Sequence, residues 1–302
     1  MSERVAIIGA GLMGHGLALV FAQGGHEVHV TDPQAEALAS LRSRIAETLK
    51  SLDRDTDCVA LVHAAPSLQQ AVAEADVIVE AAPEKLELKQ ELFACIESAA
   101  RSNAILASNT SVIPIGKVMA RVKNKSRALG THWWNPPYLV PLVEVIQTAE
   151  TDPAHIASMM ALLARLGKLP VHVKKDVPGF VGNRLQHALW REAISLIENG
   201  VCDAETVDQV VKNSFGRRLA VLGPIENADL VGTDLTLDIH KQVLADLEDS
   251  HAPSPLLEEL VAEGKLGFKT NRGFKDWTED EKTNVRQRVY AHLLMLNNIG
   301  RK

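Results

Sequence analysis

A short apolar run, a glycine-rich turn and a helix-forming stretch follow one another near the start of this chain. Residues 5–8 are all apolar, Gly9, Gly11 and Gly14 come next with the spacing GxGxxG, and residues 17–22 are apolar again. A short continuous apolar run is typical of a strand buried on both faces of a parallel sheet. The order of strand, glycine turn and helix predicts a dinucleotide-binding unit, with an empty glycine turn as the alternative.

Each position of this turn has a physical role. Gly9 allows the tight turn, Gly11 lets the backbone approach a pyrophosphate, and Gly14 permits close packing of the helix on the strand. The free N–H groups at the start of the helix, at Leu12 and Met13, favour a phosphate. We therefore expect these five residues to bind a cofactor.

Asp32 ends a second predicted strand, residues 27–31. It follows Gly14 at close to the spacing of about 20 residues expected for the acid that binds the adenosine ribose. A carboxylate ~4 Å from a 2′-phosphate would cost up to about 4 kcal/mol at an effective dielectric constant of ~20. The predicted cofactor is therefore NAD rather than NADP.

The rest of the first half continues the alternation of strands and helices. Residues 76–80 and 104–108 are further short apolar runs, and residues 34–50 and 85–100 are helix-forming. This alternation predicts an α/β fold, a Rossmann-type doubly wound and mostly parallel sheet over residues 1–177.

From Pro178 onward a helical period dominates. Apolar residues recur up to a stop at Asn199-Gly200, Asp203 is a predicted N-cap, and further helices are expected over 225–247 and 255–263. The sequence predicts a smaller all-α domain over residues 178–302.

Composition excludes several classes of partner. The formal charge of -6 argues against a nucleic acid or an anionic membrane surface. No run of ~18 apolar residues predicts a transmembrane helix. The three cysteines are too widely spaced for a metal knuckle and odd in number, so we predict no metal site and a reducing, cytoplasmic compartment. A small-molecule substrate is the favoured partner.

His132 and Glu144 form a candidate catalytic pair. His132 opens the stretch HWWNPP, whose prolines favour an extended loop, and Glu144 interrupts the apolar run 141–146. If the two segments are neighbours, Glu144 can accept the Nδ1–H of His132 and leave Nε2 to take a proton. The alternatives are a structural histidine and an acid on an edge strand that faces water.

Seven ordered motifs, spread over nearly the whole chain, resemble the L-3-hydroxyacyl-CoA dehydrogenase family. They are GAGLMG (9–14) with Asp32, EAAPE (80–84), SNTS (108–111), HWWNP (132–136), LVEV (142–145), PGFVGNR (178–184) and GKLGFKTNRGF (264–274).

The resemblance implies His132 as general base and Glu144 as its orienting partner. It also implies Ser111 and Asn183 as hydrogen-bond donors to the substrate oxygen. Read alone, Ser111 could cap a helix, and Asn183 could face water in a helix that begins at Pro178.

The resemblance further places Glu84 and Lys89 near the nicotinamide ribose, although a solvated helix face is the alternative for both. The family pairs its helical domains about a two-fold axis, so we expect a homodimer.

Two features depart from the acyl-CoA pattern. Residues 33–57 are short for the helical hairpin that helps hold CoA in the family, and Trp133-Trp134 replaces the usual Phe-Phe, which predicts a narrow space beside the base. Together with residues 135–144 and 217–224, these features resemble the branch that oxidises free hydroxy carboxylates, which includes gulonate, carnitine and pyridine-carboxylate dehydrogenases.

A free carboxylate substrate needs a cation. Arg184, Arg217 or Arg218 could bind it bidentately, with surface charges as the alternative interpretation.

The main hypothesis is therefore an NAD-dependent dehydrogenase that oxidises the hydroxyl of a small 3-hydroxy acid. The first alternative is a short-chain 3-hydroxyacyl-CoA dehydrogenase. The second is a non-catalytic NAD-binding or structural protein, as in the lens crystallins recruited from this family.

Overall fold

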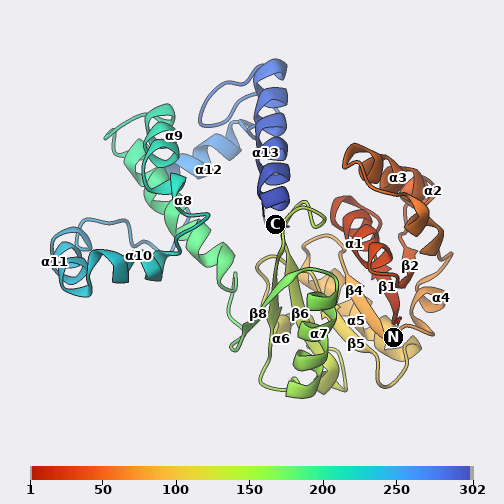
Figure 1. Ribbon diagram of the computed structural model, residues 1–302. Helices are drawn as coiled ribbons and strands as arrows, with labels where there is room; N and C mark the ends of the chain where they lie inside the picture. Colours follow the sequence, from red (N-terminus) through yellow and green to blue (C-terminus); the bar gives the residue numbers. More distant parts are fainter. Residues whose placement is uncertain (1, 300–302) are drawn as a thin grey trace. The chain divides into compact units, whose positions relative to one another are not determined.

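The computed structural model describes residues 2–299 and divides into two compact units. Among the described residues, the first unit comprises 2–184 and 293–299, and the second comprises Leu185–His292. The first unit contains the whole sheet (Figure 1).

The sheet has eight strands in the order β3-β2-β1-β4-β5-β6-β7-β8. The first six strands are parallel, β7 runs antiparallel to β6, and β8 is parallel to β7. This confirms the predicted mostly parallel, doubly wound fold. The strands are β1 (Arg4–Ile8), β2 (Glu27–Thr31), β3 (Val62–Ala64), β4 (Val77–Glu80), β5 (Ile105–Ser108), β6 (Ala128–Trp133), β7 (Leu142–Ile146) and β8 (Leu169–Val173).

Helices cover both faces of this sheet and create two cores (Figure 1). Side chains alternate across a strand, so Val5 and Ile7 of β1 enter one core while Ala6 and Ile8 enter the other. The helical elements of this unit are α1 (Leu12–Gln23), α2 (Ala35–Ala39), α3 (Leu41–Ser51), η1 (Asp57–Leu61), α4 (Leu68–Val72), α5 (Leu86–Ala99), α6 (Ile115–Val118), η2 (Lys125–Arg127) and α7 (Pro153–Arg165).

The predicted helical stretch 34–50 is divided in two at Ser40. The Ser40 hydroxyl donates to the carbonyl of Glu36, 2.8 Å away, and such local bonds compete with the regular helix pattern. The result is a short pair, α2 and α3, after β2.

The second unit is helical, as expected, but its helices differ from the predicted ones in two places. Gly232, at φ 105, separates α10 from α11 within the predicted stretch 225–247. The last long helix, α13, was not predicted. Asp203 does cap α9, accepting from the backbone N of Thr206 at 2.8 Å. The elements are α8 (Gly182–Glu198), α9 (Ala204–Asn213), η3 (Phe215–Arg217), α10 (Pro224–Val231), α11 (Thr233–Val243), α12 (Pro255–Ala262) and α13 (Glu279–Ile299), of which α8 and α13 reach into the first unit.

None of the helices in the described part of the chain combines the length and apolar character that a membrane span requires.

Candidate active site

His132 and Glu144 lie directly opposite each other on β6 and β7. His132 Nδ1 and Glu144 Oε2 are 2.7 Å apart, and the residues are only 4% and 1% exposed. The interpretation of Glu144 as a water-facing acid on an edge strand is wrong, because β7 is flanked by β6 and β8. The antiparallel register brings together two side chains from separate segments of the chain.

The second oxygen of Glu144 is also fully engaged. Glu144 Oε1 accepts from the backbone N–H groups of Val181 and Gly182, at 2.9 and 3.1 Å. Burial by itself raises the pKa of this carboxyl, but the hydrogen bonds from His132, Val181 and Gly182 outweigh it and hold the pKa below its ordinary value. Glu144 is therefore an ionised acceptor at neutral pH, which fixes the orientation of the His132 ring.

The turn before α8 supplies these N–H groups. Gly179 and Phe180 have φ values of 74° and 52°, a left-handed conformation that a helix does not tolerate. The helix therefore begins at Gly182, and its expected start at Pro178 is wrong. The ring of Phe180 also flanks His132, with centroids 5.7 Å apart.

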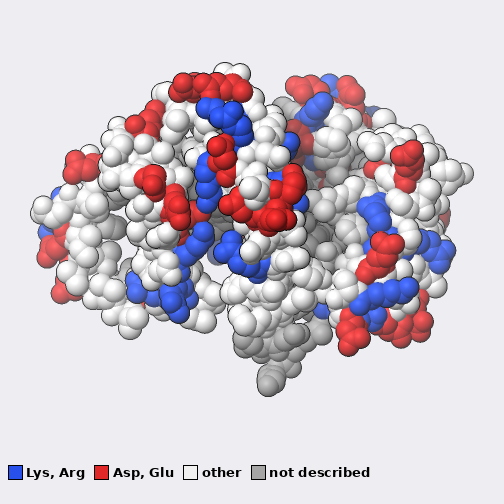
Figure 2. Space-filling view, turned by 90° about the horizontal axis from the view of Figure 1, so that it is seen from above, with Lys and Arg blue, Asp and Glu red and all other residues white. Residues whose placement is uncertain are grey.

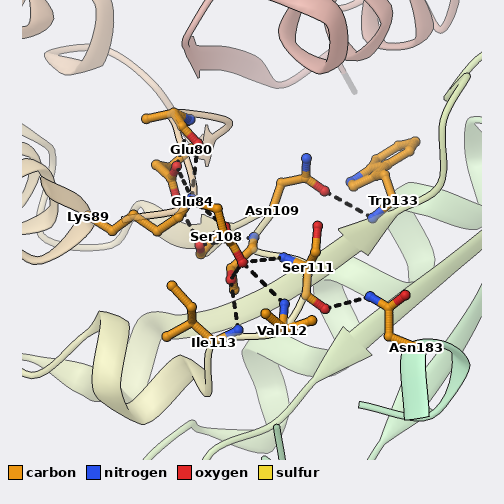
Figure 3. Close-up of polar contacts among 12 residues, drawn as sticks. Glu80, Glu84, Lys89, Ser108, Asn109, Ser111, Val112, Ile113, Trp133 and Asn183 are labelled. Atoms are coloured by element: carbon orange, nitrogen blue, oxygen red, sulfur yellow. Dashed lines mark hydrogen bonds and ion pairs between the residues drawn. The ribbon is translucent and has the colours of Figure 1, made fainter. Parts of the chain in front are cut away.

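Asn183 follows this turn and does not face water. It is 9% exposed, and its Nδ2 donates to the backbone carbonyl of Ser111 at 2.7 Å. Figure 3 shows this bond joining the start of α8 to the loop after β5. The structure thus brings together Ser111 and Asn183.

The Ser111 loop is held by Glu84. Glu84 Oε1 accepts from Ser111 N at 2.9 Å, Val112 N at 3.2 Å and Thr110 Oγ1 at 2.5 Å (Figure 3). Burial raises the pKa of Glu84, whereas these bonds and nearby Lys89 lower it, with a net shift below the ordinary value. Ser111 itself is exposed, and Glu84 anchors its backbone.

Lys89 is completely buried, so its interpretation as part of a solvated helix face is wrong. Its Nζ contacts Glu80 Oε1 at 2.7 Å, Glu84 Oε2 at 3.3 Å and the carbonyl of Ala82 at 3.2 Å. Ser108 adds a bond to the other oxygen of Glu80 at 2.6 Å (Figure 3). Sequence reasoning missed this ion-pair network. An acid at the end of an apolar strand, Glu80, was the available signal.

The glycine turn fits a dinucleotide. Gly9 has a φ of 115°, and a Cβ at Gly14 would lie 1.8 Å from the Gly9 carbonyl oxygen, so no other residue fits at either position. A Cβ at Gly11 would meet nothing within 4 Å, and no side chain caps the N-terminus of α1. An open backbone approach to uncapped helix N–H groups is the arrangement that accepts a diphosphate.

The other residues predicted for the cofactor lie around this turn. Leu12 is 66% exposed and Met13 is half-buried at the start of α1. Asp32 closes β2, and its carboxylate accepts from Ala10 N at 2.7 Å and Gln34 N at 2.8 Å. Asp32 thus ties the glycine turn to β2 while part of its surface faces solvent.

The two tryptophans after His132 point to opposite faces of the sheet. Trp133 is 3% exposed and packs on Phe21 of α1, with centroids 5.9 Å apart. The expectation that both narrow the space beside the base is therefore wrong for Trp133. The ring centroids of Trp134 and His132 are 5.1 Å apart. A Cβ at Gly182 would come within 2.4 Å of the Trp134 ring.

The three predicted substrate arginines are all exposed. Arg184 donates from Nη1 to the carbonyl of Pro178 at 3.4 Å. Arg217 and Arg218 belong to the second unit, in and after η3. Their role as cations for a substrate carboxylate stays a prediction.

A doubly wound sheet with an uncapped glycine turn and a buried histidine–carboxylate pair defines a dinucleotide-dependent oxidoreductase as the class. A family model described as "3-hydroxyacyl-CoA dehydrogenase, NAD binding domain" matches residues 4–177, and the one for the C-terminal domain matches residues 179–277. The chain belongs to the 3-hydroxyacyl-CoA dehydrogenase family and carries its NAD-binding domain.

Relatives include proteins named for both kinds of substrate. The chain is 36% identical over 286 residues to 5-formyl-3-hydroxy-2-methylpyridine 4-carboxylate 5-dehydrogenase of Mesorhizobium japonicum, with 93% of each chain covered. It is 35% identical to a probable 3-hydroxybutyryl-CoA dehydrogenase of Bacillus subtilis, with 92% of this chain and 98% of the relative covered.

A solved structure agrees closely with the fold. The crystal structure of a 5-formyl-3-hydroxy-2-methylpyridine 4-carboxylic acid 5-dehydrogenase, described as an NAD+-dependent dismutase, matches with a TM-score of 0.91 and 33% identity. The match covers 99% of this chain and 98% of that one. These findings confirm the predicted family, enzyme class and NAD cofactor.

Proposed function

We propose that this protein oxidises the secondary alcohol of a small hydroxy carboxylate to a ketone. The observation that carries the proposal is the buried contact of 2.7 Å between His132 Nδ1 and an ionised Glu144. NAD, when bound at the glycine turn, supplies the acceptor for the hydride that leaves the carbinol carbon.

The residues of the chain then manage the hydroxyl proton. The Nδ1–H of His132 is engaged in the hydrogen bond to Glu144. Nε2 of His132 is therefore the nitrogen that takes the proton from the alcohol. The imidazolium that forms is stabilised by the Glu144 carboxylate. Glu144 is thus an orienting and electrostatic partner and does not itself take the proton.

Ser111 and Asn183 are proposed as donors to the substrate oxygen. The bond from Asn183 Nδ2 to the Ser111 carbonyl and the anchoring of Ser111 by Glu84 support a shared position for these groups. Neutral donors stabilise a developing alkoxide without competing for its proton.

Two observations favour a small free acid as substrate. Trp134 occupies space beside His132, and the short pair α2 and α3 is the whole helical insertion between β2 and η1. The pyridine carboxylate named for the Mesorhizobium relative is a substrate of this size. Charged groups of both signs are interspersed on the face in Figure 2, which favours a small substrate over a polyanion.

The family description and the Bacillus relative favour the alternative, a short-chain acyl-CoA thioester. The test compares kcat/KM for 3-hydroxybutyrate, related hydroxy carboxylates and 3-hydroxybutyryl-CoA by NADH absorbance. We expect a free acid to be preferred at least tenfold. A strong preference for the thioester would replace the proposal with the alternative.

We further propose a homodimer formed through the helical region, residues 178–302, and a reducing, cytoplasmic location. Exposed apolar side chains concentrated in the second unit support the dimer. Three free cysteines, Cys58, Cys95 and Cys202, support the reducing compartment. Sedimentation of the purified chain tests the dimer, and a monomer at micromolar concentration would contradict it.

A further inference from the structure

Arg44 of α3 reaches back to the glycine turn. Its Nη2 donates to the carbonyl of Ala10 at 2.7 Å and to the carbonyl of Ala37, in α2, at 2.8 Å. Its Nε donates to Ser40 Oγ at 3.2 Å. Three acceptors therefore hold one planar, half-buried guanidinium in a single orientation.

Ala10 is bound at both of its backbone polar groups. Its N–H donates to Asp32 Oδ2 and its carbonyl accepts from Arg44, both at 2.7 Å, and the residue is fully buried. A peptide unit is planar and trans, so fixing the Ala10 carbonyl also fixes the direction of the Gly11 N–H on the opposite side of the same peptide.

This peptide leads into Gly11, the N-cap residue of α1. Gly9, at φ 115°, and Gly11, without a side chain, leave the turn freer to rotate than other sequences would. Two bonds from outside the turn restrict this rotation. One comes from Arg44 of α3, and the other is made by Asp32 at the end of β2. An arrangement already set in the free protein lowers the cost of binding.

We propose that Arg44 is a positioning residue of the cofactor site, which orients the Ala10–Gly11 peptide for the diphosphate of the dinucleotide. This rests on the NAD-binding role of the domain and is independent of the substrate proposed above. Arg44 acts here through Ala10, and a lysine cannot replace it because one ammonium does not hold three acceptors in a plane.

The experiment measures ligand binding by calorimetry for the wild type, Arg44→Met and Arg44→Lys. The ligands are NAD and ADP-ribose, which contain the diphosphate, and adenosine, which lacks it. We expect both variants to raise Kd for NAD and ADP-ribose about tenfold, which is ~1.4 kcal/mol. Kd for adenosine should change less than twofold, which also shows that the variants fold.

Two control variants separate this role from its neighbours. Arg42→Met removes an exposed charge from the same helix. Thr48→Val removes the contact of 3.4 Å from Thr48 Oγ1 to His15 Nε2, which joins α3 to α1, and the bond of 2.9 Å from Thr48 Oγ1 to the backbone carbonyl of Arg44, while the Arg44 guanidinium keeps its acceptors. We expect both to bind NAD as the wild type does.

Any of four results would overturn the proposal. These are unchanged NAD affinity in Arg44→Met, full retention in Arg44→Lys, equal weakening of adenosine and ADP-ribose, and equal weakening in Thr48→Val. Binding is measured without turnover, so failure of the dehydrogenase proposal would leave these outcomes unaffected.

Discussion

The two units differ in what they bury. In the first, apolar side chains pack on both faces of the sheet, and two buried charged groups have close partners, Lys89 with Glu80 and His132 with Glu144. Among the described residues of Leu185–His292, Leu260 is the one large apolar side chain that is buried, at 9% exposure. The first unit has a complete interior, whereas the second does not.

The exposed side chains of the second unit are large. Val221, Ile225 and Leu230 are 84%, 74% and 73% exposed, and similar residues occur along α8 and α11. Large apolar side chains that are exposed in such number are typical of an interaction site. The contrast teaches that the residues of the proposed chemistry make their contacts within one unit, while the proposed dimer would account for the exposed apolar side chains of the other.

The strongest test of this comparison removes the proposed base. His132→Gln should lower kcat by about 10²–10⁴-fold, because a positioned base contributes that much, and NAD affinity should stay within a few fold. Steady-state kinetics and calorimetry measure both. His155→Gln, on α7, is the matched control and should be near wild type. Turnover close to normal in His132→Gln would remove this residue from the mechanism.

A second test breaks the buried ion pair of the first unit. Lys89→Met leaves Glu80 buried without its cation, so we expect a loss of about 3–5 kcal/mol in the free energy of unfolding. Denaturant titration measures it. Exposed Lys85→Met should cost less than about 0.5 kcal/mol. Equal stability of the two variants would mean that the interior network does not support this unit.

A third test uses Lys168, which lies between α7 and β8 in the first unit. Its Nζ donates to the carbonyls of Pro137 and Val140, and burial lowers its pKa from 10.5 to about 8, with a smaller effect from Arg54. Between these pH values the unfolded chain holds the proton that the folded chain has lost. The free energy of unfolding should therefore rise between pH 8 and 10.5.

The rise in the free energy of unfolding that this pKa change allows is at most about 3 kcal/mol. The two carbonyls make it smaller, because they stabilise the charged form of Lys168. The quantity to measure is the difference between wild type and Lys168→Met, from urea titrations at several pH values. A difference that stays flat, or that falls with pH, would show that Lys168 is not desolvated in solution.

The smallest expected effect concerns the second unit and tests whether another copy covers it. If the second unit is covered by another copy, its unfolding temperature should rise by about 3 °C for each tenfold increase in protein concentration, since association stabilises only the folded form. Hydrogen exchange of residues 185–292 against temperature follows that unit separately. A midpoint independent of concentration would contradict the dimer.

Local spacing explains why the cofactor half was predictable. The strand, the glycine turn, α1 and Asp32 lie within one continuous segment, and the steric demands at Gly9 and Gly14 are local. The pairing of His132 with Glu144 was a hypothesis that needed two neighbouring strands, and the register of β6 and β7 supplied them.

The misses have a common cause. Lys89 has the polarity of a surface residue, yet the acid that holds it comes from β4, outside its own helix. Trp133 and Trp134 are adjacent in sequence, but strand alternation sends one to the core beneath α1. The start of α8 depended on the left-handed backbone at Phe180, which is rare for a residue other than glycine.

By itself, the sequence determined the fold class, the cofactor turn and the family, because these depend on short-range periodicity and on glycine positions that few folds can use. Only the tertiary structure decided which polar groups meet. Burial, register and the direction of a side chain are properties of neighbours distant in the chain. Arg44 shows this most clearly, since nothing around it in the sequence indicates that it reaches the carbonyl of Ala10.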